Sequence, residues 1–81
     1  MQKEIIIYSK DNCPKCEQVK QVCSQLGLKF IVKNITHDLI KLTEFREKFV
    51  GAGFPVVEFP DGMTIAGNLE EIYQHIENTN K

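Results

Sequence analysis

The sequence predicts an α/β domain in which a four-stranded mixed sheet is flanked by three helices, in the order βαβαββα. Short apolar runs alternate with segments whose apolar residues recur every three or four positions, as expected for strands and helices. Pro60, Asp61 and Gly62 form a turn between the last two apolar runs. With 81 residues, of which 42% are hydrophobic, the chain is expected to fold as one domain over residues 1–81 with its own core.

The first strand and helix are predicted from a change in apolar spacing. Residues 4–8 contain the apolar run Ile5–Tyr8 and are predicted to form a buried strand, and residues 14–26 follow a helical pattern. The apolar positions of that helix are Val19, Val22, Cys23 and Leu26. Gly27 is expected to end it, and Asp11 and Asn12 are interpreted as residues that cap its start.

The second strand and helix repeat this arrangement. A strand is predicted from Leu28 to Ile35, and Thr36 is expected to cap the helix that follows. One face of this helix carries Leu39, Leu42, Phe45 and Phe49. Gly51 and Gly53 end it. Because a helix connects the first two strands, they should be parallel, with a right-handed crossover.

The last part of the chain predicts a hairpin and a third helix. Strands are expected over Val56–Phe59 and Met63–Ala66, antiparallel because a tight turn joins them. Asn68 followed by Glu71 resembles a capping box. The apolar stripe of the final helix is Leu69, Ile72, Tyr73 and Ile76.

Composition and charge exclude several classes of protein. The net charge is -1 and Lys and Glu are mixed along the chain, so no basic tract indicates nucleic-acid binding. The apolar runs are too short for a membrane span, and the first residues lack the pattern of a signal peptide. We therefore expect a cytoplasmic protein. Three cysteines cannot form a complete disulfide framework, so a catalytic or metal-binding use is favoured.

Cys13 and Cys16 form a Cys-x-x-Cys pair between the first strand and the first helix. Unpaired backbone N–H groups and the helix dipole favour the thiolate of a cysteine at the first turn. A thiol three residues further on can displace a mixed disulfide and close an intramolecular one. The pair is interpreted as a catalytic nucleophile, Cys13, and a resolving thiol, Cys16.

The element order, the Cys-Pro-Lys-Cys sequence and the Gly-Phe-Pro sequence before the hairpin resemble glutaredoxin, within the thioredoxin fold. The similarity covers nearly the whole chain. Pro14 makes the motif similar to the Cys-Pro-Tyr-Cys of dithiol glutaredoxins. The resemblance implies a thiol-disulfide oxidoreductase that reduces protein disulfides or glutathione mixed disulfides. Glutathione would be the co-substrate, and no metal or prosthetic group would be bound.

The resemblance also implies a set of substrate-binding residues around the cysteines. Lys10 matches a position that contacts the glycine carboxylate of glutathione, although a solvated surface lysine is an equal alternative. Lys15 replaces the tyrosine that lies along glutathione in relatives. Pro55 matches the cis-proline of the family, and the backbone of Phe54 would pair with an extended substrate.

The start of the third helix corresponds to the γ-glutamyl site of the family. The backbone N–H groups of Leu69 and Glu70 would receive the carboxylate, and Glu70 or Glu71 would meet the ammonium group. Both glutamates are equally explained as partners of the helix dipole.

Three alternative functions remain open. The main one is a redoxin, reduced by a thioredoxin reductase, that donates electrons to a protein such as ribonucleotide reductase. A second is a module that holds an iron–sulfur cluster between two copies through Cys13 and glutathione, whereas the catalytic form is expected to be a monomer. Structural zinc is disfavoured because Cys23, His37 and His75 match no common ligand spacing.

Cys23 is interpreted as a core residue, with a regulatory disulfide as the alternative.

Overall fold

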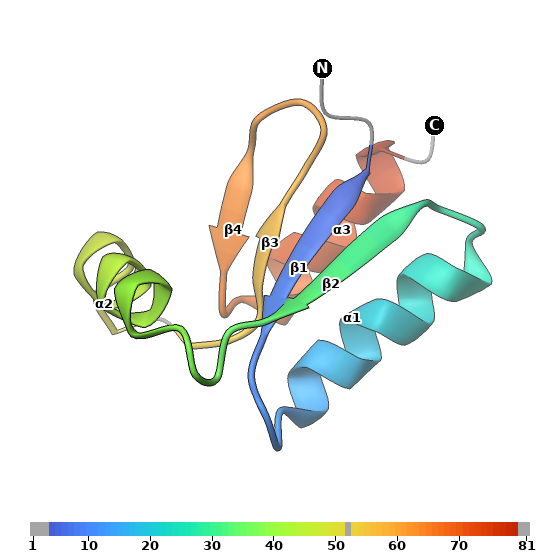
Figure 1. The fold of residues 1–81 in the computed structure, drawn as a ribbon. Helices are drawn as coiled ribbons and strands as arrows, with labels where there is room; N and C mark the ends of the chain where they lie inside the picture. Colours follow the sequence, from blue (N-terminus) through green and yellow to red (C-terminus); the bar gives the residue numbers. More distant parts are fainter. Residues whose placement is uncertain (1–3, 52, 80–81) are drawn as a thin grey trace.

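The computed structural model describes residues 4–51 and 53–79, which form one four-stranded sheet with helices on both faces (Figure 1). The elements, in chain order, are β1 (Ile5–Ser9), α1 (Pro14–Gln25), β2 (Phe30–Asn34), α2 (Leu39–Lys48), β3 (Val56–Glu58), β4 (Thr64–Ala66) and α3 (Leu69–Thr79). Strand β1 pairs in parallel with β2 and antiparallel with β3, and β4 is antiparallel to β3. The predicted fold class, mixed sheet and element order are confirmed.

Strand β1 lies in the centre of the sheet and contributes to the core on both faces. Helices α1 and α3 cover one face, and α2 lies on the other (Figure 1). Ile5 and Ile7 pack with α1 and α3, whereas Tyr8 packs with α2, because successive strand residues point to opposite faces. Burial on both faces explains why this strand is an uninterrupted apolar run.

Helix α2 packs more loosely than the other two helices and contains no fully buried residue. Phe45 and Phe49 contact the Tyr8 side of the sheet, as predicted. Leu39 is 76% exposed, so its assignment to the apolar stripe was wrong. The helix is anchored by its later turns, and its first turn projects into solvent.

The caps of the first two helices differ from the sequence prediction. Asp38, not Thr36, caps α2, and its Oδ1 accepts a hydrogen bond of 3.0 Å from the N–H of Lys41. The hydroxyl of Thr36 is used elsewhere, because it accepts a 2.7 Å hydrogen bond from the N–H of Asp11. The residue that caps α1 is Cys13, so the prediction that Asp11 and Asn12 cap this helix was also wrong.

The hairpin and the start of α3 agree with the prediction, although β3 and β4 are each shorter than expected. The N–H of Gly62 donates to the carbonyl of Phe59 at 3.0 Å, and Gly62 has a φ of +94°. Asn68 accepts a 3.1 Å hydrogen bond from the N–H of Glu71, which places it as the cap of α3. This turn and cap bring the start of α3 beside the end of β4.

Candidate active site

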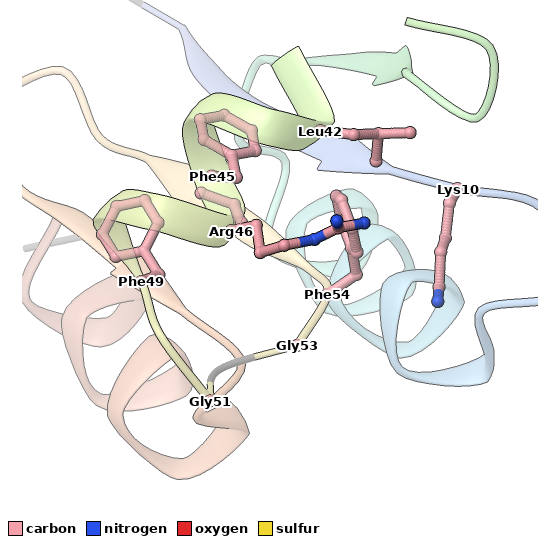
Figure 2. A pocket seen from close by; sticks show the side chains of 9 residues that line it. Lys10, Leu42, Phe45, Arg46, Phe49, Gly51, Gly53 and Phe54 are labelled. Carbon is pink, nitrogen blue, oxygen red and sulfur yellow. The ribbon is translucent and has the colours of Figure 1, made fainter. Parts of the chain in front are cut away.

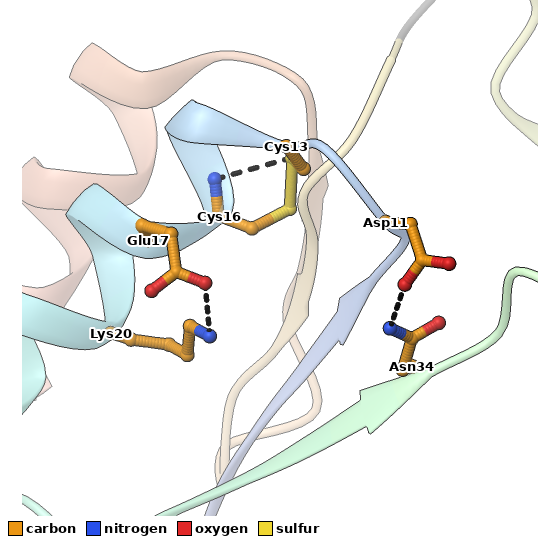
Figure 3. Close-up of polar contacts among 6 residues, drawn as sticks. All are labelled: Asp11, Cys13, Cys16, Glu17, Lys20 and Asn34. Carbon is orange, nitrogen blue, oxygen red and sulfur yellow. Dashed lines mark hydrogen bonds and ion pairs between the residues drawn. A yellow bond between two sulfur atoms is a disulfide. The ribbon is translucent and has the colours of Figure 1, made fainter.

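Cys13 and Cys16 are joined by a disulfide at the start of α1, with their Cα atoms 5.3 Å apart (Figure 3). Cys13 is the N-cap residue with extended backbone angles, and Pro14 begins the helix, where its missing N–H is not needed. The sulfur of Cys13 accepts a 3.3 Å hydrogen bond from the N–H of Cys16. The sulfur thus occupies the position of a capping oxygen and faces the positive end of the helix dipole.

The two cysteines of the motif differ sharply in solvent exposure. Cys16 is only 1% exposed and belongs to the buried side of α1, whereas Cys13 is partly exposed. An incoming disulfide can therefore reach Cys13 but not Cys16. The roles of Cys13 as nucleophile and Cys16 as resolving thiol stay predictions, and they require this asymmetry.

The loop before Cys13 is fixed to the end of β2 by polar contacts that the sequence did not indicate. Asn34 donates from its side-chain amide to Asp11 Oδ1 at 2.9 Å (Figure 3). The hydroxyl of Thr36 accepts a hydrogen bond from the N–H of Asp11. Asn12 turns the chain with a φ of +59°, a conformation that asparagine tolerates better than most residues. These contacts hold the approach to the helix in one geometry.

The Phe54–Pro55 peptide bond is cis, as the family resemblance implied. Pro55 is buried, and its carbonyl accepts a 2.9 Å hydrogen bond from the N–H of Gly67. Within the described part of the chain, no backbone hydrogen bond occupies the N–H or carbonyl of Phe54. These groups are available to pair with an extended chain.

A cavity of about 390 Å³ lies between α2 and the segment before Pro55 (Figure 2). We call it the aromatic cavity, and its lining residues are Lys10, Leu42, Phe45, Arg46, Phe49, Gly51, Gly53, Phe54 and Val56. The Nζ atom of Lys10 lies 5.6 Å from the centre of the Phe54 ring. Lys10 and Phe54 are predicted binding residues, whereas no sequence pattern indicated Arg46, whose guanidinium reaches from α2 toward Phe54 (Figure 2).

A second, shallower depression of about 530 Å³ is lined by the start of α1, the segment after α2 and the start of α3. We call it the glycine depression, and its residues are Lys15, Gly51, Gly53, Ala66, Gly67, Asn68 and Leu69. Lys15 and Leu69, both predicted to bind glutathione, are therefore brought together. Glu70 instead lines a groove between α1 and α3, and Glu71 lines neither depression.

Cys23 lies in the core between α1 and α3, which supports its interpretation as a packing residue. Burial raises the pKa of its thiol to about 11. Among residues 4–51 and 53–79, no group of three or more His, Cys, Asp and Glu side chains is arranged to hold a metal ion.

The fold and this cysteine pair define a dithiol redox protein with a thioredoxin fold. Residues 5–63 match the family model of glutaredoxin, and the chain belongs to this family of thiol-disulfide oxidoreductases. Comparison of the sequence with curated proteins gives no significant match. None of the described helices has the length and apolar character needed to cross a membrane.

Solved structures that share the fold include the following three. The thioredoxin-like protein BC3987 is 21% identical, with a TM-score of 0.66 over 88% of this chain and 97% of that chain. NrdH-redoxin from Escherichia coli, described as a glutaredoxin-like protein with a thioredoxin-like activity profile, is 22% identical, with a TM-score of 0.67 over 88% and 92%. The protein XcR50 from X. campestris is 18% identical, with a TM-score of 0.66 over 91% and 96%.

Proposed function

We propose that the protein reduces protein disulfides or glutathione mixed disulfides, with Cys13 as the attacking thiolate and Cys16 as the resolving thiol. The observation that carries this proposal is the contrast between the accessible Cys13 at the helix cap and the buried Cys16 behind it. Backbone N–H groups at the cap stabilise a thiolate on Cys13, and the thiolate is the form that attacks disulfides.

The reaction proceeds by two thiol–disulfide exchanges. The Cys13 thiolate attacks one sulfur of the substrate disulfide, whose S–S bond breaks and releases the other sulfur as a thiolate. The Cys16 thiolate then attacks the Cys13 sulfur, closes the intramolecular disulfide and releases the second substrate sulfur. The substrate gains two electrons, and the protein is left with the Cys13–Cys16 disulfide.

Glutathione is the reductant that we propose for this disulfide. Its glycine carboxylate would lie near Lys10, and its γ-glutamyl carboxylate near the first turn of α3. The N–H groups of Leu69 and Glu70 have no hydrogen-bond partner in the described part of the chain, which supports a carboxylate site there. Glu70 lines the groove between α1 and α3 and Glu71 lines neither depression, so both carboxylates are assigned to the positive end of the α3 dipole.

Reduction by a thioredoxin reductase is the second candidate. Lys15 stands where relatives have a tyrosine along glutathione, and the aromatic cavity offers a surface for a protein partner. The structural similarity to NrdH-redoxin supports reduction by a thioredoxin reductase. The protein would then carry electrons to an enzyme such as ribonucleotide reductase. In either case we propose a monomer in the cytoplasm, where both kinds of reductant keep thiols reduced.

Reduction kinetics of the oxidised protein separate the two reductants. The oxidised protein is mixed with glutathione, or with NADPH and a thioredoxin reductase, and free thiols are counted by alkylation and mass. Rapid reduction by glutathione, through a glutathione adduct on Cys13, supports the first candidate. Turnover by the reductase alone would reject glutathione and assign Lys10 and Lys15 to other roles. A Lys29→Gln variant, changed at an exposed lysine outside both depressions, serves as the control.

A further inference from the structure

We propose that the aromatic cavity is a specificity pocket for protein substrates, which accepts a large apolar side chain that is accompanied by a carboxylate. This inference rests on the proposed disulfide reduction and names the substrates that the site prefers. The favoured substrate is a polypeptide with an aromatic or large aliphatic residue, and an acidic residue, within two positions of its reactive cysteine.

The walls of the cavity are apolar and its size suits one side chain. Phe45 lies between the other two rings, with its centroid 5.9 Å from that of Phe49 and 6.5 Å from that of Phe54. All three rings remain partly exposed, so they offer apolar surface that an incoming group would cover. A buried cavity of about 150 Å³ is enough to hold benzene. The open cavity of about 390 Å³ therefore has room for a phenylalanine-sized group.

The charge of the cavity adds a second requirement. Lys10 and Arg46 line it from different elements, and its lining residues, all within the described ranges, include no Asp or Glu. Arg46 makes no ion pair with the described residues, whereas the nearby Glu44 is engaged by Lys41 at 3.5 Å. Two cations without an acidic partner beside an apolar surface favour a ligand that is both apolar and anionic.

The position of the cavity links it to the redox pair. Phe54 contributes both its ring to the cavity and its backbone to the edge available for an added strand. Lys10 precedes Cys13 by three residues, and Gly51 and Gly53 line both depressions. An extended substrate that pairs with Phe54 advances about 3.3 Å per residue, so a side chain near its cysteine can reach the cavity.

Glutathione cannot use this pocket in the same way. The residue that follows its cysteine is glycine, which has no side chain to place against the three rings. A polypeptide can fill the cavity and a tripeptide with glycine cannot, so the cavity favours protein substrates over glutathione mixed disulfides. One well-filled apolar subsite changes the specificity ratio by about tenfold or more.

Single-turnover kinetics with short peptides test this inference. Each peptide carries one cysteine linked by a disulfide to thionitrobenzoate, whose coloured thiolate is released when Cys13 attacks the peptide sulfur and Cys16 then frees the peptide. The three peptides are Asp-Phe-Cys-Phe-Asp, Asp-Gly-Cys-Gly-Asp and Asn-Phe-Cys-Phe-Asn, and the thionitrobenzoate disulfide of glutathione is the reference. Their symmetry makes the result independent of the direction in which the chain binds.

We expect the fully reduced protein to react about tenfold faster with the Phe/Asp peptide than with the Gly/Asp peptide. The Phe/Asn peptide should react about threefold more slowly than the Phe/Asp peptide. The Arg46→Gln variant should remove that difference in rate while it keeps the preference for Phe over Gly. Phe49→Ala should weaken the preference for Phe, and Lys29→Gln should match the wild type. Arg46 is exposed, so its variant tests the inference even where Phe49→Ala fails to fold.

One result would overturn the proposed pocket alone, and a different result would overturn the proposed function as well. Equal rates for the Phe/Asp and Gly/Asp peptides, with rapid reaction of the glutathione reference, would reject the pocket and leave the proposed function intact. No release of thionitrobenzoate from any of the four compounds would reject the proposed function, and the pocket with it.

Discussion

Cys23 provides a quantitative prediction because its environment should make it almost inert to alkylation. Its side chain is 0% exposed in the core, and burial raises its pKa to about 11. At pH 8 such a thiol is about 0.1% thiolate, compared with about 24% for an unperturbed cysteine with a pKa of about 8.5. The thiolate fraction alone predicts alkylation about 200-fold slower than that of a free cysteine, before steric protection is counted.

The assay is a time course of iodoacetamide labelling followed by intact mass. The fully reduced native protein should gain its first label on the accessible Cys13. The buried Cys16 should be labelled far more slowly, and the third label, on Cys23, should appear only after denaturation. A Cys23→Ala variant should give the same native time course and lose the third label. Native labelling of Cys23 within tenfold of the rate of Cys13 would refute the account of a sealed core and restore the regulatory role.

The remaining predictions concern stability and pH. Asn68→Ala removes the cap of α3 and should cost about 1 kcal/mol, measured as a fall in Tm of about 4–8 °C; an unchanged Tm would show that the cap is unimportant. Ile72→Ala should cost about 2–5 kcal/mol in urea unfolding, because this side chain is 0% exposed between α1 and α3; a loss below about 1 kcal/mol would contradict the packing. The hydrogen bond from the Met63 N–H, aided by His75, lowers the pKa of Asp61. A depressed folded-state pKa gives stability that is present above the unfolded value, near 3.8, and is lost as pH falls through the folded value. Asp61→Asn should therefore flatten the decline of the urea midpoint below about pH 4, and an equally steep decline in wild type and variant would contradict this assignment.

The parts of the fold that the sequence predicted depend on local patterns. The apolar run of β1, the spacing of Val19 and Cys23 in α1 and the Asn68 cap are each determined within one element, and each is confirmed. Thr36 and Asp38 are both residue types that can cap a helix. The hydroxyl of Thr36 is bound by the N–H of Asp11, 25 residues earlier in the chain, and Asp38 caps α2 instead. Such long-range competition cannot be read from neighbouring residues.

The candidate site was predicted where its motif is continuous in sequence and missed where it is assembled by the fold. Cys13 and Cys16 are defined by spacing, whereas the cis state of Pro55 followed only from the family resemblance, because most X-Pro bonds are trans. Arg46 carried no signal because a charged helix residue is usually solvated. Its place with Lys10 in the lining of the aromatic cavity depends on how α2 packs across the sheet.

The most direct test of the central claim, that Cys13 is the nucleophile, is a trapping experiment with two matched variants. Cys16→Ser and Cys13→Ser are each reduced and mixed with a disulfide substrate, and the mixed disulfide is measured by mass. The account predicts rapid accumulation of an adduct on Cys13 in Cys16→Ser, because the sulfur that would resolve it is gone. An adduct that forms equally fast on the buried Cys16 in Cys13→Ser would contradict the account.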